Sequence, residues 1–261
     1  MILQDFDKEK IAILNPYELE KKVDNFPKIG VTCFSKKLID KYVALYNPKE
    51  IARISNANGK VPVYEIEYKG TKIAFFMSRV GASACVVSYE EVMAMGLEKL
   101  IMFGTCGVLD KDIGDCSIII PTRAIRDEGT SYHYLEESEE VSVNEKYVDI
   151  FERILQEHNY SHIKGKVWTT DAPYRETKDK MQKRKEQGCV CVDMECSAMA
   201  AVAKFRNKDF FQFFYAADNL DSTNWDKRSL GNDANLNEKE KIVLFALELA
   251  NSIEKELTSK S

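Results

Sequence analysis

Residues 209–218 read DFFQFFYAAD, an almost wholly apolar and aromatic-rich run that ends in an acid, Asp218. A continuous apolar run of this length is typical of a strand buried on both faces of a sheet. In parallel sheets, ligands bind just beyond the carboxyl ends of the strands. A carboxyl group held there loses part of its hydration, so its pKa should rise toward that of a usable proton donor. Asp218 is therefore the candidate general acid; the alternative is a loop aspartate that begins a turn in DNLDST.

Length and composition indicate an ordinary globular α/β protein. The 261 residues suit one large domain or two small ones, and the lack of repeats or Pro/Gly/Ser-rich linkers favours a single domain over residues 1–261. The net charge of −5 offers no broad basic surface, so we expect no nucleic-acid partner. No apolar stretch reaches transmembrane length, and MILQDFDKEK does not resemble a signal peptide. We therefore expect no membrane partner and a cytoplasmic location.

The seven cysteines and three histidines do not predict a metal centre. They contain no CxxC pair and no metal-ligand spacing, so we expect neither a zinc site nor any other metal. Several cysteines lie inside apolar runs, which is typical of small buried hydrophobic residues in a reducing compartment.

Hydrophobic periodicity predicts alternating strands and helices. A hairpin is predicted where VPVYEIEY and TKIAFFM flank a YKG turn. The other predicted strands cover 29–32, 99–103, 116–125, 166–170 and 209–217, and the predicted helices cover 83–96, 145–160, 175–188, 194–205 and 237–257. This order predicts an α/β layered domain with a mixed, mainly parallel sheet.

Small or polar residues follow four of these strands, at Thr32, at 104–107, at 169–171 and at Asp218. If the strands are parallel, their ends share one edge and surround a pocket; the alternative is that loops after strands are polar in any case. The segment GTCG, 104–107, predicts a tight turn whose N–H groups could hold an anion, although many such turns are purely conformational.

Two acids, Asp193 and Glu195, begin a helix otherwise built of Ala, Met, Cys and Ser. Acids in a first turn usually complement the helix dipole. This helix has no polar face, however, which suggests that Glu195 is a buried carboxylate in need of donors, and two vicinal hydroxyls would supply them. The segment AIRDEGTSYHY, 124–134, which carries Arg126, is either a solvated loop or the wall of a site or subunit contact.

Together these segments resemble the nucleoside phosphorylase family, which includes uridine phosphorylases and the hexameric bacterial-type purine nucleoside phosphorylases. The resemblance spans about residues 25–250. CVDMECSA is similar to the family's V-E-M-E-x-A signature, and the stretch from VGASAC to GTCGVL is similar to its G-x-G-x-P-S … G-T-x-G-x-L segment. IRDEGTSYHY resembles the R-x-D-G-x-S-x-H loop of uridine phosphorylases, and AADNL resembles the S-D strand end of purine-type members.

The resemblance implies a three-layer α/β/α fold around a mixed, barrel-like sheet. It also implies phosphorolysis of nucleosides to a free base and a pentose 1-phosphate, a transferase reaction of nucleotide salvage with inorganic phosphate as co-substrate and no cofactor. Homo-oligomers, dimers or hexamers, are implied as well. Asp218 would protonate a purine ring nitrogen. The substrate contacts implied are Glu195 on the ribose hydroxyls, Met194 on the sugar face, Thr105 and the backbone from Gly104 on phosphate, and Tyr174 near the base, with Asp193 and Arg126 as further candidates.

Two phosphate-binding arginines of the family are missing. The family's G-D-P-x-R loop is here GVTCFSKK, and the arginine before G-T-x-G is here Met102. Arg79 or Lys36 is a candidate replacement, and Arg53 or Lys60 a candidate contact across a subunit boundary. A nucleosidase that uses water, or a nucleoside-binding protein without turnover, therefore stays open. Asp218 favours purine nucleosides, whereas IRDEGTSYHY favours uridine.

Overall fold

The computed structural model describes residues 2–57, 59–232 and 234–258. The strands are β1 (Ile29–Cys33), β2 (Lys49–Asn56), β3 (Gly59–Tyr68), β4 (Thr71–Met77), β5 (Lys99–Val108), β6 (Ile118–Asp127), β7 (Glu140–Ser142), β8 (His162–Thr170), β9 (Cys189–Asp193) and β10 (Asp209–Asn219). Across the described residues they form one sheet, in the order β10-β6-β8-β9-β5-β1-β4-β3-β2 with β7 beside β6. The predicted hairpin is confirmed as the antiparallel pair β3–β4.

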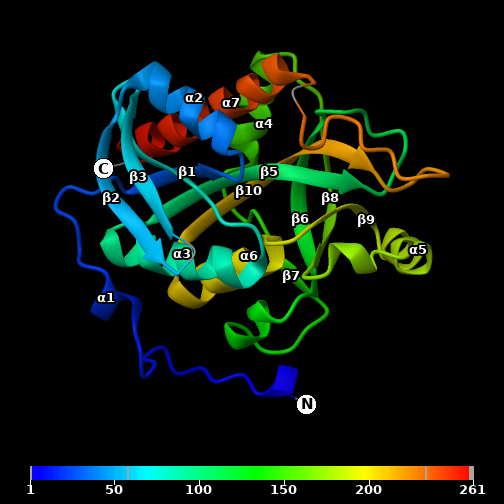
Figure 1. The fold of residues 1–261 in the computed structure, drawn as a ribbon, viewed down its shortest axis with the longest axis horizontal. Helices are drawn as coiled ribbons and strands as arrows, with labels where there is room; N and C mark the ends of the chain where they lie inside the picture. The colour runs from blue at the N-terminus through cyan, green and yellow to red at the C-terminus, as the bar shows by residue number, and fades with distance from the viewer. Residues whose placement is uncertain (1, 58, 233, 259–261) are drawn as a thin grey trace.

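Helices cover both faces of this sheet. They are α1 (Pro16–Leu19), α2 (Lys36–Tyr46), α3 (Ala82–Met95), α4 (Val148–Glu157), α5 (Lys178–Glu186), α6 (Cys196–Arg206) and α7 (Leu236–Thr258), with short 3-10 turns η1 (Ile2–Gln4), η2 (Thr130–His133) and η3 (Pro173–Arg175). Figure 1 shows α2, α4 and α7 on one side of the sheet and α3 and α6 on the other. The predicted three-layer arrangement is confirmed, and each layer buries its own apolar cluster against the sheet.

β10 closes part of the sheet into a barrel. It pairs in parallel with β5 and antiparallel with β6, so that β10, β6, β8, β9 and β5 form a closed ring. Every residue of β10 from Phe211 to Asn219 is buried, as the continuous apolar run predicted. The barrel-like mixed sheet is therefore confirmed, and Asp218 lies at the carboxyl end of a central strand.

The expected shared edge of parallel strands is only partly correct. β1, β5 and β10 run parallel. The fourth strand expected at this edge, β8, instead runs parallel to β6 and β9, which are antiparallel to β10 and β5. Two of the threonines expected at that edge, Thr32 and Thr169, form hydrogen bonds inside the protein instead. Thr32 Oγ1 donates to the Phe76 carbonyl at 2.9 Å, and Thr169 Oγ1 donates to Asp193 at 2.7 Å.

The prediction of a tight turn at 104–107 was wrong, because β5 continues through these residues to Val108. Neither glycine has a left-handed backbone. A Cβ at Gly104 would lie 2.7 Å from the Phe34 ring, and one at Gly107 would lie 2.5 Å from Leu220 Cδ1. Both glycines therefore serve close packing rather than chain reversal.

None of the described helices combines the length and apolar character needed to cross a bilayer. All seven cysteines are free and buried, as expected for small hydrophobic side chains.

Candidate active site

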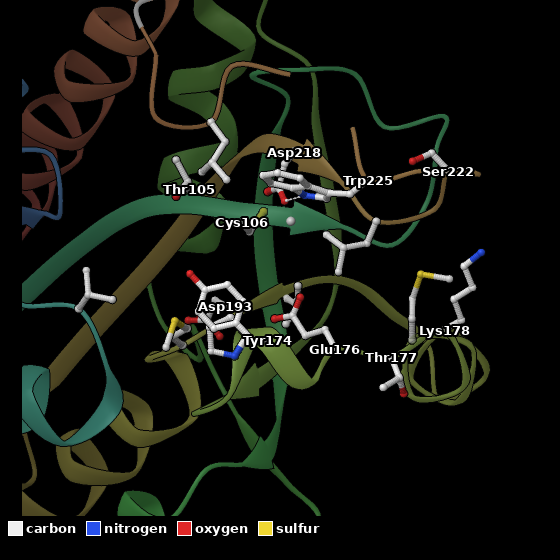
Figure 2. A pocket seen from close by; sticks show the side chains of 18 of the residues that line it. Thr105, Cys106, Tyr174, Glu176, Thr177, Lys178, Asp193, Asp218, Ser222 and Trp225 are labelled. Atoms are coloured by element: carbon white, nitrogen blue, oxygen red, sulfur yellow. Dashed lines mark hydrogen bonds between the residues drawn. The ribbon is translucent and has the colours of Figure 1, made fainter. Parts of the chain in front are cut away.

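A cavity of about 690 Å³ opens beside the carboxyl ends of β5, β9 and β10 (Figure 2). Its size suits a small-molecule ligand. Six of the residues proposed from the sequence line it: Thr105, Tyr174, Asp193, Met194, Glu195 and Asp218. The cavity thus brings together side chains from parts of the chain that are more than a hundred residues apart.

Asp218 enters the cavity at an irregularity in β10. The β10–β5 register shifts between Ala216 and Asp218, and a bulge of this kind re-aims the side chain that follows it. Trp225 Nε1 donates to Asp218 Oδ2 at 2.8 Å. Burial raises the pKa of the Asp218 carboxyl, while the Trp225 bond and the charge of Arg228 partly oppose that rise. The group therefore holds a proton more readily than an exposed aspartate.

Glu195 is buried where α6 begins, and its Oε1 accepts the Gly81 N–H at 2.6 Å. Gly81 has φ +96°, a conformation that favours glycine, and it directly precedes α3 as its N-cap residue. Burial, together with the nearby charge of Asp193, raises the pKa of Glu195. The loop before α3 and the start of α6 therefore hold one carboxyl group between them.

Asp193 lines the cavity, but its carboxyl group supports the start of α6. One oxygen accepts the N–H groups of Glu195 at 3.0 Å and Cys196 at 2.7 Å, and the other accepts the Thr169 hydroxyl. These bonds satisfy N–H groups at the start of the helix and fix the backbone that carries Met194 and Glu195. The helix-start role weighed from the sequence thus fits Asp193.

Glu176 and Trp225 are two of the lining residues that the sequence analysis did not propose. Burial and the charge of Asp218 raise the pKa of Glu176 to about 7, and Figure 2 shows its carboxyl group directed into the cavity below Asp218. Trp225 is the large aromatic residue of an otherwise polar loop, and that contrast was the available signal. Glu176 carried no comparable signal, because it lies next to the highly charged helix α5.

The remaining lining residues proposed from the sequence differ in exposure. Met194 is half-buried, Thr105 is exposed to the cavity, and Tyr174 is 98% exposed at its mouth. Tyr174 therefore has room to move onto a bound ligand.

Three proposed residues lie outside the cavity lining: Gly104, Arg79 and Arg126. Arg79 Nη2 donates to the Gly59 carbonyl at 2.8 Å. Arg126 is buried against the Tyr132 ring, and its guanidinium donates to the two hydroxyls of Ser131 and Ser138 and to two carbonyls of the 135–136 segment. Its donors are used to hold its own loop, which argues against a substrate contact in this cavity.

The lining is strongly acidic. Among the described residues it contains four carboxyl groups, those of Glu176, Asp193, Glu195 and Asp218, and a single cationic side chain, Lys178. Within the residues that the structure describes, no group of three or more His, Cys, Asp or Glu side chains is placed to hold a metal ion. The four carboxyl groups of the lining can transfer protons and take part in hydrogen bonds.

Residues 28–249 match the family model described as the phosphorylase superfamily. The chain belongs to this superfamily. A guanosine phosphorylase from Halorubrum lacusprofundi is 26% identical over 149 residues, which cover 56% of this chain and 61% of that protein. The chain thus aligns with less than two thirds of this relative's length.

Several solved structures share the fold of this chain. Uridine phosphorylase from Vibrio fischeri ES114 superimposes with a TM-score of 0.75 at 21% identity, covering 89% of this chain and 95% of that one. Purine nucleoside phosphorylase from Toxoplasma gondii in complex with immucillin-H gives 0.76 at 16% identity, covering 89% and 94%. AMP nucleosidase from Bacteroides thetaiotaomicron gives 0.71 at 16% identity, covering 91% and 93%.

Proposed function

We propose that this chain cleaves the N-glycosidic bond of nucleosides by phosphorolysis, giving a free base and a pentose 1-phosphate, with purine nucleosides preferred over uridine. One observation carries the proposal: Glu195 and Asp218 line the same cavity. A group that holds the sugar and a group that protonates the base must share one cavity to act on the same bond. Membership of the phosphorylase superfamily supports the same reaction class.

Glu195 would hold the sugar. One of its oxygens already accepts the Gly81 N–H, and the carboxylate retains lone pairs for two vicinal ribose hydroxyls. Donation from two hydroxyls would favour the ionised form of Glu195, against the burial that raises its pKa, and burial keeps water from competing for these bonds. Met194, half-buried beside it, would pack against the sugar ring.

Asp218 would protonate the leaving base. A phosphate oxygen forms the new bond to the anomeric carbon, while the electron pair of the breaking C–N bond passes to the base. The Asp218 proton then neutralises that charge at a purine ring nitrogen. Its raised pKa keeps more of the acid form available near neutral pH. Uracil lacks an equivalent ring nitrogen, so the same group favours purines.

A nucleosidase that uses water is the second candidate, and the charge of the lining favours it. Four carboxyl groups face the cavity and Lys178 is the single cation among the described lining residues. Little positive charge is therefore available to hold a phosphate anion unless further cations, for example from another subunit, reach the cavity. Water carries no charge and needs no such compensation.

A nucleoside panel with and without inorganic phosphate separates these functions. We expect inosine and guanosine to give free base and pentose 1-phosphate only when phosphate is present. Equal rates without phosphate, with free pentose as product, would replace phosphorolysis by hydrolysis. Absence of cleavage of every nucleoside under both conditions would contradict both functions.

Two substitutions test the assigned residues. Asp218→Asn should lower purine turnover about 100-fold while largely sparing any uridine turnover. Glu195→Gln should weaken binding of ribosides more than that of 2′-deoxyribosides. Equal loss of purine and uridine turnover in Asp218→Asn would rule out the proton-donor role. Equal weakening of riboside and 2′-deoxyriboside binding in Glu195→Gln would rule out the sugar-binding role.

The proposal also covers the domain organisation, cellular location, assembly and substrates of the enzyme. We expect one domain that acts in the cytoplasm, in nucleotide salvage, as a homo-oligomer. Nucleoside and phosphate would be its substrates, without a further cofactor.

A further inference from the structure

Trp225 has no role in the function proposed above, yet it is bonded to the group placed at its centre. It lies in the loop that follows β10 (residues 220–232), lines the cavity, and donates to Asp218 Oδ2 at 2.8 Å. Figure 2 shows the indole directly beside the Asp218 carboxyl group. Its side chain is 60% exposed, so packing in the core does not account for its position.

The loop backbone fixes where Trp225 stands. Asn219 and Asp226 exchange two backbone hydrogen bonds, of 2.8 and 3.2 Å, which join the two ends of the segment that contains Trp225. Arg228 ties the same loop to the body of the protein by donating to the Ile113 carbonyl at 2.7 Å. The bond between Trp225 and Asp218 is thus supported from both sides of the loop.

We propose that Trp225 is a positioning residue for Asp218, holding Oδ2 by its indole N–H so that the acid presents its proton on Oδ1. This inference rests on the proposed function. An indole N–H can only donate, so Oδ2 must act as an acceptor. In a carboxylic acid the carbonyl oxygen is the better acceptor, which leaves the hydroxyl at Oδ1.

The space around Oδ1 agrees with this assignment. A Cβ at Gly107 would lie 3.3 Å from Asp218 Oδ1, so Oδ1 lies over a glycine that itself lines the cavity. Gly107 offers no Cβ that would crowd this oxygen from β5, and the space that a Cβ would occupy is taken by Leu220 Cδ1. With Oδ2 occupied by the indole N–H, the proposed arrangement places the proton on Oδ1.

The charged groups and hydrogen bonds around Asp218 determine whether loss of the Trp225 bond raises or lowers its pKa. Asp226 and Arg228 face it from its own loop, and Glu176 faces it from the end of η3. Asp226 and Glu176 favour the protonated acid, whereas Arg228 and the Trp225 N–H favour the ionised form. Removing the indole N–H must therefore raise the pKa of Asp218.

Trp225→Phe tests the inference, with Trp168→Phe as a matched control. Trp168 Nε1 also donates to an aspartate, Asp127 at 2.9 Å, but it is buried away from the cavity lining. In Trp225→Phe we expect kcat for inosine to fall about tenfold, and the pH at which kcat/KM declines on the alkaline side to rise by about one unit. Trp168→Phe should leave that pH unchanged.

Carboxyl ¹³C NMR provides a readout independent of turnover. The Asp218 signal is identified by its loss in Asp218→Asn, and its midpoint should rise in Trp225→Phe. An unchanged midpoint, or an unchanged alkaline limb of the rate profile in an active enzyme, overturns the inference. If the wild-type protein cleaves no nucleoside, the proposed function fails, while the shifted Asp218 titration would still support the Trp225 contact.

Discussion

Replacement of Glu176 by glutamine should stabilise the protein, and only at neutral and alkaline pH. Burial and the neighbouring charge of Asp218 raise the pKa of Glu176 from 4.5 to about 7. Between these two values the native protein retains a proton that the unfolded chain has already released. Stability must therefore fall as pH rises through this window.

The magnitude follows from the size of that shift. One pKa unit corresponds to about 1.4 kcal/mol, so the full shift would be about 3 kcal/mol. The carboxyl group keeps part of its contact with solvent, which screens the charge, and we expect about 1–2 kcal/mol. No hydrogen bond to the Glu176 carboxyl is present among the described residues, so glutamine loses no bonded partner there.

Urea unfolding at about pH 4.5 and about pH 8.5 measures this effect. Glu176→Gln should raise the free energy of unfolding at the higher pH and change it little at the lower one. Glu137→Gln, in an exposed loop outside the cavity, is the control and should change neither value. An equal change at both pH values, or a loss of stability at the higher one, would refute the reasoning.

Three further substitutions separate packing from chemistry. Gly107→Ala should lower the free energy of unfolding by only about 1 kcal/mol, because Leu220 Cδ1 can move aside. The added methyl group should nevertheless crowd Asp218 Oδ1 and lower purine turnover about tenfold. An unchanged kcat would contradict this expectation. Asp193→Ala should lower the free energy of unfolding by about 3 kcal/mol, since two N–H groups at the start of α6 lose their acceptor. In a urea titration, a loss below about 1 kcal/mol would argue against the role of Asp193 in supporting α6. Arg126→Lys should cost about 2 kcal/mol in the same assay while leaving KM for nucleosides unchanged, and a raised KM would place it at the substrate.

Several features of the fold were predictable because they depend on local pattern. The run at 209–218 is apolar throughout, and a strand of that kind is stable only where both faces are covered, so its place at the centre of the sheet followed. The small residues of α6 likewise required close packing on every side. By contrast, GTCG looked like a turn, because a glycine needed for close approach cannot be distinguished locally from one needed for chain reversal.

The site could be predicted only in outline. Asp218 and Glu195 stood out because each is an acid beside an apolar element, which is costly unless the acid has a partner or a use. Arg126 also stood out, but its guanidinium turns into its own loop, and nothing in residues 124–134 shows that direction. Glu176 and Trp225 were missed because each matters through its proximity to Asp218. Glu176 is distant from Asp218 along the chain, and Trp225 lies within a polar loop whose path the sequence does not reveal.

Taken by itself, the order of residues determined which segments become strands and helices and which acids lie beside buried elements. Only the folded chain decided which of those acids share a cavity, which partner each one has, and how readily each holds its proton. The physical reason is range: the periodicity of apolar residues acts within one element, whereas desolvation, hydrogen bonds and charge act between whichever groups the fold brings within a few ångströms.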